Sequence, residues 1–174
     1  MVVPAAILAG GRSSRMGTDK ALLDIGGTPL AVRTFNSLHA SGCNPIHLVG
    51  RQPALHTLGI AVISDEDERS HPLYGLVAAL SHCEHELMLI APCDIPNLSP
   101  EHVQHILAYG QPCIAISDGR THPLLGLFSV AMLSRARQIA DENGSVHEFT
   151  QNMTRLDLPS PSLLNLNFPS DLPS

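Results

Sequence analysis

Short apolar runs alternate along this chain with segments in which apolar residues recur every three or four positions. The runs have the length of β-strands, and the periodic segments have the spacing of one helix face. The expected strands are 2–8, 46–49, 60–63, 87–91, 113–116 and 153–158, with extended stretches at 21–25 and 123–130. The expected helices are 29–41, 72–80, 100–109, 131–140 and a short one near 146–151. This alternation predicts an α/β protein with three layers (α/β/α) and a mostly parallel central sheet.

The most apolar run, 87–91 (LMLIA), predicts a strand at the centre of the sheet, because central parallel strands are covered on both faces. Ser99 and Pro100 then stand where a helix N-cap and first residue are preferred. The 174 residues show no internal repeat and no linker, which predicts one domain over 1–174. The Pro- and Ser-rich end, about 169–174, is expected to be irregular.

Composition argues against several functions. The formal net charge is −6, aromatic residues make up 3% of the chain and Trp is absent. A protein that binds nucleic acid would need a basic surface or aromatic stacking platforms. No apolar run reaches the length of about 18 residues that a membrane span needs, and Met1 leads into the first strand without the basic region of a signal peptide. Scattered cysteines without CxxC spacing predict free thiols and a cytoplasmic setting.

The loop after the first strand predicts an anion site. Gly10 and Gly11 allow close approach of the backbone to a ligand, and free N–H groups there can bind phosphate. Arg12, Arg15 and Lys20 follow, and Lys20 is the only lysine of the chain. A lysine offers a compact point charge for a phosphate group. The alternative is an ordinary strand-to-helix turn with a solvated basic rim, although such turns are usually about 2–6 residues long.

Asp94 is the strongest single candidate for a metal ligand. Ligands of open parallel sheets bind beyond the carboxyl ends of the strands, and Asp65 and Asp94 both follow expected strands. A carboxylate that faces phosphates suits Mg²⁺, which takes one or two protein carboxylates together with phosphate oxygens and waters. The alternative is that Asp94 only forms a turn before Pro96. The common fingerprints GxxxxGKS/T and GxGxxG are absent, which disfavours a P-loop hydrolase or an ordinary dehydrogenase.

Five ordered segments resemble one family. LAGGRSSRMGTDKALL resembles the signature of nucleotidyltransferases that join an NTP to a phosphorylated acceptor, especially the molybdenum cofactor guanylyltransferases. HPLYGL resembles the family's GPLxG segment, PCDIPNLSPEHV its acidic metal motif, DGRTHPLLGLFS its DGxxHPxxAL region, and NLNFPSDL its closing NxNTPEDL. The resemblance covers essentially the whole chain. It implies a Rossmann-like nucleotidyltransferase fold and a Mg²⁺-dependent enzyme that transfers GMP from GTP to the phosphate of molybdopterin, releasing pyrophosphate.

The resemblance also implies roles for particular residues. The nucleotide would contact the Leu8-Ala9-Gly10-Gly11 backbone. Catalysis and triphosphate binding would rest on Arg15, Lys20 and the Mg²⁺ ligand Asp94, while Asp65 would meet the base or ribose and Gly75 would line the pocket. Asn165 and Asn167 would lie on the acceptor side. The expected partners are GTP, molybdopterin and, transiently, other cofactor-biosynthesis proteins or molybdoenzymes, with no nucleic acid and no membrane.

Three positions depart from the family pattern. Leu48 stands where a nucleotide-contacting Asn is frequent, His71 where Gly is usual and Phe168 where Thr is usual. The Leu48 departure leaves open a related transferase that uses CTP, or a sugar or cobinamide phosphate as acceptor. A non-catalytic nucleotide-binding protein is a further alternative, which the intact Arg15, Lys20 and Asp94 disfavour.

Ten histidines raise the question of a zinc site. His82 and His85 lie close together, and His102 and His105 share a helix face, but both pairs stand in polar stretches near helix ends. We therefore expect these histidines to lie on the surface and not to bind zinc.

Overall fold

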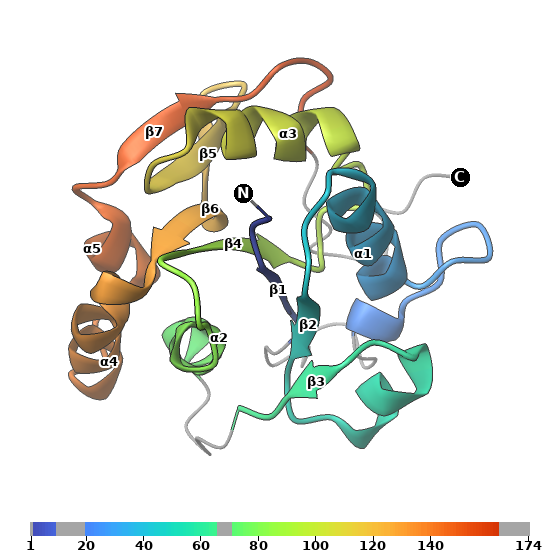
Figure 1. Ribbon diagram of the computed structural model, residues 1–174, viewed down its shortest axis with the longest axis horizontal. Coiled ribbons are helices and arrows are strands. Elements are labelled where there is room, and N and C mark those ends of the chain that lie inside the picture. Colours follow the sequence, from blue (N-terminus) through green and yellow to red (C-terminus); the bar gives the residue numbers. More distant parts are fainter. Residues whose placement is uncertain (1, 10–19, 66–70, 164–174) are drawn as a thin grey trace.

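A computed structural model describes residues 2–9, 20–65 and 71–163 of the chain. Within these ranges a seven-stranded sheet has the order β3-β2-β1-β4-β6-β5-β7 (Figure 1). The strands are β1 (Ala5–Leu8), β2 (Ile46–Val49), β3 (Val62–Ile63), β4 (Leu87–Pro92), β5 (Cys113–Ser117), β6 (Arg120–Ser129) and β7 (Thr154–Asp157). The helices are α1 (Leu30–Ala40), α2 (Pro72–Ser81), α3 (Pro100–Tyr109), α4 (Leu133–Asp141) and α5 (Val146–Thr150), with short 3-10 helices η1 (Lys20–Leu22), η2 (Pro53–Leu58) and η3 (Val130–Met132).

The sheet is mostly parallel, as predicted. β1 pairs in parallel with β2 and β4, β2 with β3, and β5 with β7. Only β6 runs against its neighbours β4 and β5 among the described strands. Gly126 of β6 permits this pairing, because a Cβ atom there would overlap the carbonyl oxygen of Cys113.

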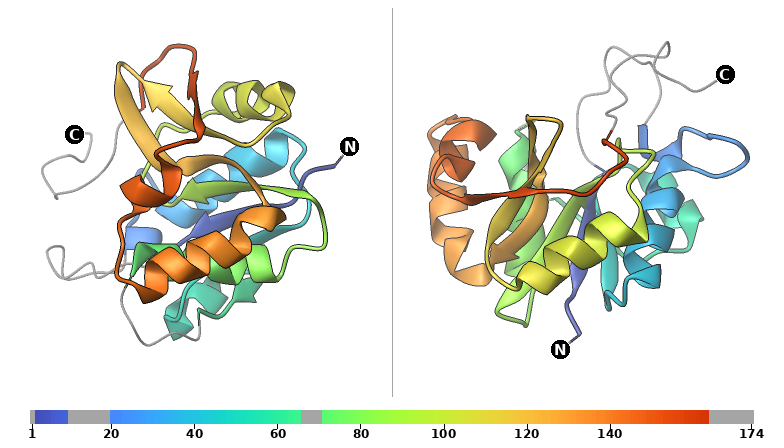
Figure 2. Two further views of the ribbon diagram at one scale, coloured as in Figure 1. Left: turned by 90° about the vertical axis from the view of Figure 1, so that its left-hand side faces the viewer. Right: turned by 90° about the horizontal axis from the view of Figure 1, so that it is seen from above.

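Helices cover both faces of the sheet, which confirms the three predicted layers (Figure 2). Alternate residues of β1 point to opposite cores, as successive side chains of a strand do. Ala5 and Ile7 pack on the side of α1 and α3, while Ala6 and Leu8 pack on the side of α2 and α4. β4, the strand predicted to be central, has three strands on each side in this sheet.

Local structure departs from the prediction mainly around the strand ends. The stretch 21–25 was expected to be extended, but Lys20–Leu22 form η1. This turn forms because the Leu23 N–H donates a hydrogen bond to the Lys20 carbonyl at 3.1 Å. Residues 60–63 contribute only Val62–Ile63 to the sheet. The helix η2 was not predicted; it begins at Pro53 and ends at Leu58, before Gly59, whose φ of 70° is the left-handed value that glycine adopts readily.

The structure also bears on the cysteines and on possible membrane spans. All four cysteines lie in the described part of the chain, and all are free thiols. No helix within the described residues combines the length and the apolar character that crossing a membrane requires.

Candidate active site

The carboxyl ends of β1, β2, β3 and β4 lie at one edge of the sheet, because these strands are parallel. Hydrogen bonds extend the ladder past the strand ends: Ala9 N donates to the Val49 carbonyl at 2.9 Å, and Gly50 N to the Ile63 carbonyl at 3.1 Å. Cys93 N donates to the Leu8 carbonyl at 3.2 Å. The residues that follow the strands are therefore held in one row.

The order of the strands reverses between β1 and β4. The chain proceeds from β1 outward through β2 to β3, and then returns to place β4 on the other side of β1. Such a switch point is where open α/β sheets bind their ligands, beyond the carboxyl ends of the strands. Here the switch point is flanked by Leu8 and Ala9 at the end of β1 and by Asp94 just after the end of β4.

Lys20 and Asp94 meet at this switch point. Lys20 Nζ lies 3.4 Å from Asp94 Oδ2, although 74 positions separate the two residues in the sequence. The side chains are 21% and 23% exposed, so both charges remain accessible from solvent. The predicted phosphate-binding lysine and the predicted metal ligand are thus brought together.

The loop that bears Asp94 is anchored by two side chains of α1 and by one side chain of its own. Ser37 Oγ of α1 donates to the Leu98 carbonyl at 2.6 Å, and Asn97 Nδ2 donates to the Ser162 carbonyl at 2.6 Å. Arg33 of α1 donates from Nε to the Pro96 carbonyl and from Nη1 to the Ile25 carbonyl, at 3.4 Å each. Arg33 therefore connects the Asp94 loop to the turn that follows Lys20.

Leu8, Ala9 and Gly75, which are predicted to bind the nucleotide, also lie at this edge. Leu8 and Ala9 are 7% and 5% exposed, so their side chains are buried, and the predicted contact of a nucleotide with their backbone stays a prediction. A Cβ atom on Gly75 of α2 would lie 3.5 Å from Leu8 Cδ2 and 4.0 Å from Val49 Cγ1. The first turns of α2 therefore pass directly over the end of β1. Asp65 is half-buried and follows β3 at the same edge.

Several predicted site residues lie outside the described residues. These are Gly10, Gly11, Arg12 and Arg15 in the 10–19 stretch, and Asn165, Asn167 and Phe168 in the 164–174 stretch. Their placement stays a prediction.

Two departures from the family pattern acquire a structural explanation. Leu48 is fully buried in the core on the side of α1 and α3, so its side chain does not face the switch point. His71 is the N-cap of α2, and its Nδ1 accepts a hydrogen bond from Leu73 N at 3.2 Å. Neither the burial of Leu48 nor the capping role of His71 was predicted. For His71 the reason is that an N-capping histidine leaves a weaker sequence signal than Ser, Thr, Asp or Asn.

The prediction that the paired histidines lie on the surface is wrong for His102. His82, His85 and His105 are exposed, but His102 is completely buried at the start of α3. Both of its ring nitrogens are engaged by protein groups, and no group of three His, Cys, Asp or Glu side chains in the described ranges is placed to hold a metal ion. Its ring hydrogen-bonds to the backbone N–H of Ser99, the N-cap of α3, and to the carbonyls of Pro159 and Pro161.

Asp94 remains the residue that fits Mg²⁺. It offers a partly exposed carboxylate at a strand end beside a cation that can hold phosphate, and Mg²⁺ binds through one or two carboxylates while phosphates and waters complete its shell. A single protein carboxylate is consistent with this mode of binding.

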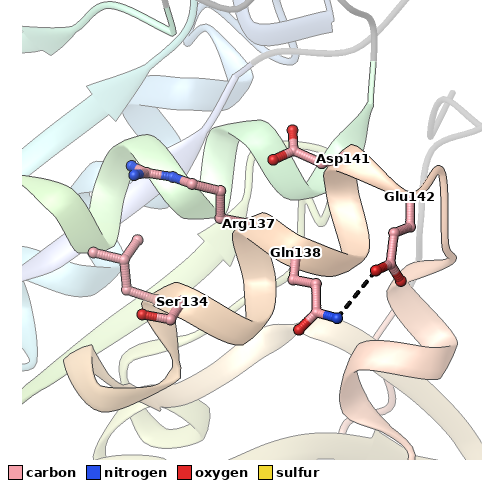
Figure 3. Close-up of a pocket in the computed structure, with 6 residues that line it drawn as sticks. Ser134, Arg137, Gln138, Asp141 and Glu142 are labelled. Atoms are coloured by element: carbon pink, nitrogen blue, oxygen red, sulfur yellow. Dashed lines mark hydrogen bonds between the residues drawn. The ribbon is translucent and has the colours of Figure 1, made fainter.

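An open hollow on α4 is a different feature (Figure 3). Its polar side chains are largely engaged within the protein: Gln138 Nε2 donates to Glu142 Oε1 at 3.0 Å, and Asp141 Oδ1 accepts from Tyr74 Oη at 2.9 Å. None of the residues of the switch point lines it. The hollow is lined by Leu133, Ser134, Arg137, Gln138, Asp141 and Glu142.

Comparison with known families gives one consistent result. The family model described as "MobA-like NTP transferase domain" matches residues 5–156. A protein of Cupriavidus pinatubonensis named molybdenum cofactor guanylyltransferase is 37% identical over 144 residues, which cover 75% of this chain and 72% of the relative. One of the same name from Rhizobium rhizogenes is 30% identical over 192 residues, covering 98% of this chain and 89% of that protein.

Solved structures show the same fold. The crystal structure of molybdopterin-guanine dinucleotide biosynthesis protein A from Archaeoglobus fulgidus superposes with a TM-score of 0.78 at 19% sequence identity. The superposition covers 98% of this chain and 95% of that one. The expected Rossmann-like nucleotidyltransferase fold is confirmed.

Proposed function

Since the chain belongs to the MobA-like NTP transferase family and is a nucleotidyltransferase, we propose that it is a Mg²⁺-dependent molybdenum cofactor guanylyltransferase. It transfers GMP from GTP to the phosphate of molybdopterin, with or without bound molybdenum, and releases pyrophosphate. The observation that supports this most strongly is the Lys20–Asp94 pair at the switch point between β1 and β4.

In the proposed reaction, a phosphate oxygen of molybdopterin attacks the α-phosphorus of GTP in line. The new bond joins this oxygen to the α-phosphorus, and the bond between the α-phosphorus and the bridging oxygen to the β-phosphate breaks, so pyrophosphate leaves with its electron pair. A phosphate monoester has a second pKa of about 6 and is mostly dianionic near neutral pH. The attack therefore needs no general base.

The protein then contributes position and charge. Lys20 supplies a point charge to the triphosphate, and Arg15 is proposed to add a second one. Asp94 would hold Mg²⁺, which supplies neutralisation of the charge on the phosphate oxygens when it is bound. Lys20 Nζ and Asp94 Oδ2 already lie 3.4 Å apart. Little rearrangement is therefore needed for the Lys20 ammonium and a Mg²⁺ ion held by Asp94 to meet the same triphosphate.

The remaining contacts follow the same edge of the sheet. The backbone of Leu8, Ala9, Gly10 and Gly11 is proposed to bind the nucleotide, with Asp65 near the base or ribose and Gly75 lining the pocket. Asn165 and Asn167 are proposed to meet the acceptor. We place the reaction in the cytoplasm, with transient contacts to proteins that deliver or receive the cofactor.

Nucleotide choice is tested by calorimetric titration of GTP and CTP in the presence of Mg²⁺. The proposal expects GTP to bind more tightly, and tighter binding of CTP would replace it with a cytidylyltransferase. The buried position of Leu48 means that its departure from the family pattern does not favour CTP through a direct contact. Binding of GTP without pyrophosphate release in the presence of molybdopterin would indicate a non-catalytic nucleotide-binding protein.

A further inference from the structure

The ring of His102 bridges two parts of the chain. Its Nδ1 lies 3.1 Å from Ser99 N and 3.0 Å from Ser99 Oγ, and its Nε2 lies 3.1 Å from the Pro159 carbonyl and 3.0 Å from the Pro161 carbonyl. Carbonyl oxygens only accept hydrogen bonds and a backbone N–H only donates. The contacts therefore assign the proton to Nε2 and leave Nδ1 as the acceptor.

This histidine does more than cap a helix. Ser99 and His102 form the capping box of α3, a motif in which Glu or Gln is usual at the third helical position. A Glu would accept from Ser99 N but could donate nothing to the carbonyls of Pro159 and Pro161. His102 accepts on one side and donates on the other, and it is completely buried between the two.

The segment that His102 holds, residues 158–163, is here called the C-terminal strap. Leu158 N continues the β5–β7 ladder by donating to the Ile116 carbonyl at 2.8 Å, and Leu163 N donates to Ser117 Oγ at 2.8 Å. The Leu163 side chain is buried in the core beside α1 and α3. Ser162 Oγ also bonds to Asp118 in the turn between β5 and β6. The strap is thus fastened along its length.

The strap is also joined to the loop that bears Asp94. Asn97, three residues after Asp94, donates to the Ser162 carbonyl at 2.6 Å. Ser99, which ends the same loop, is the residue that His102 caps. The Asp94 loop and the strap therefore form one hydrogen-bonded unit, with His102 and Asn97 as its two links.

We propose that His102 is a positioning residue of the transfer site, which fixes the Asp94 loop by binding the C-terminal strap through Nε2. The catalytic part of this inference rests on the proposed function, because it treats Asp94 as part of the reaction centre. The structural part is that loss of the Nε2 donor loosens the strap and the loop together. This part does not depend on the proposed function.

The test uses three variants of the full chain. His102→Asn keeps an acceptor oxygen near Ser99 but cannot reach the strap, whereas His102→Gln keeps both an acceptor and an amide donor. His105→Asn, one turn further along α3 and exposed, is the matched control. Amide hydrogen exchange is followed at Leu163 and Leu98, with the β4 amides as a report on global stability.

His102→Asn is expected to speed exchange at Leu163 and Leu98 about tenfold or more, with the β4 amides unchanged, while His102→Gln restores slow exchange. Turnover should fall about tenfold to a hundredfold with the KM for GTP nearly unchanged, since a misplaced group costs rate rather than uniform binding. Exchange in His102→Asn equal to that in His105→Asn would overturn the proposal. Faster exchange with unchanged turnover would overturn the positioning role.

A fourth variant covers the case in which His102→Asn does not fold. Asn97→Ala removes the other link between strap and loop without touching the buried ring, and it should speed exchange at Leu163 and lower turnover in the same way. Normal exchange in that variant would contradict the proposal. The exchange experiments need no substrate, so absence of guanylyl transfer by the unaltered protein would refute the proposed function and leave the exchange result standing.

Discussion

Lys20 is the residue on which the candidate site depends most. As the only lysine of the chain, it predicts a phosphate contact, and the structure places its ammonium beside Asp94 at the switch point of the sheet. Its partner could be predicted as a site residue, but the contact between them could not, because it depends on the strand order.

Lys20→Ala is expected to reduce turnover at least about a hundredfold, because loss of one donor to such a transition state costs about 2.7–4 kcal/mol. Lys20→Arg should also be impaired, since a planar guanidinium does not replace a compact ammonium. Steady-state pyrophosphate release measures both, with Glu84→Ala as a control at an exposed position. Full activity of Lys20→Ala would remove this lysine from the site.

His47 predicts a pH dependence of stability. Burial, and secondarily the charge of His82, lower the pKa of His47 below its ordinary value of 6.5. The folded state therefore favours the neutral ring. The contribution of His47 to the free energy of unfolding is complete above pH 6.5, and it is lost as the pH falls from 6.5 through the lowered pKa. Urea unfolding at pH 7.5 and pH 5.5 should show a smaller loss of stability for His47→Gln than for the unaltered protein. Equal losses would contradict the assignment to His47.

The cysteines should differ in reactivity. Burial raises the pKa of the Cys43 thiol to about 11 and also raises the pKa of Cys113, where a hydrogen bond with the Leu127 backbone opposes the shift. At pH 8 only about one in a thousand Cys43 thiols is ionised. Brief alkylation of the native protein, read by mass spectrometry, should label the half-exposed Cys83 first. Comparable labelling of Cys43 would show that its burial is transient.

His102 shows the limit of residue-level prediction. Two histidines three positions apart in a polar stretch predict a surface pair, yet one of them is fully buried. The available signal was the sequence Ser99-Pro100-Glu101-His102, which puts His102 at the third helical position, where a capping box reaches back to the N-cap. The partners in residues 159–161 could not be foreseen, because they depend on tertiary packing.

At the scale of elements, prediction succeeded where a periodic pattern coincided with an end signal. α3 begins after Ser99 at Pro100 and ends before Gly110, whose φ of 70° closes the helix. The 20–29 region carries no comparable period, and there a local 3-10 turn formed in place of an extended strand. The two-residue β3 is too short for any pattern to define.

Gly75 offers a test that separates stability from binding. A Cβ at this position would make ordinary contact with Leu8 at 3.5 Å, and Ala is more favourable than Gly inside a helix by about 0.5–1 kcal/mol. Gly75→Ala should therefore raise the melting temperature slightly. If Gly75 lines the nucleotide pocket, calorimetry should show GTP binding weakened about tenfold.

Ala78→Gly in the same helix is the matched control for Gly75→Ala. It should lower the melting temperature by a similar amount and leave GTP affinity unchanged. Tight GTP binding by Gly75→Ala would remove this glycine from the pocket without affecting the account of Lys20 and Asp94.

At the scale of the whole molecule, alternation of strands and helices predicted three layers and a mostly parallel sheet, and both are observed. Strand order could not be predicted, because several apolar runs have similar length and composition. Their pattern does not say which strand lies beside which in the sheet. The order matters here, since it creates the switch point between β1 and β4. The antiparallel β6 was equally unforeseen, and it places β5 and β7 so that the C-terminal strap reaches the Asp94 loop.

The most direct measurement is pyrophosphate release from GTP in the presence of Mg²⁺ and molybdopterin, by the unaltered protein and by Asp94→Ala. Release by the unaltered protein should require all three components and stop when the metal is chelated. Asp94→Ala, with an unchanged circular dichroism spectrum, should release pyrophosphate at least about a hundredfold more slowly. Near-normal release by purified Asp94→Ala would contradict the proposed transfer site.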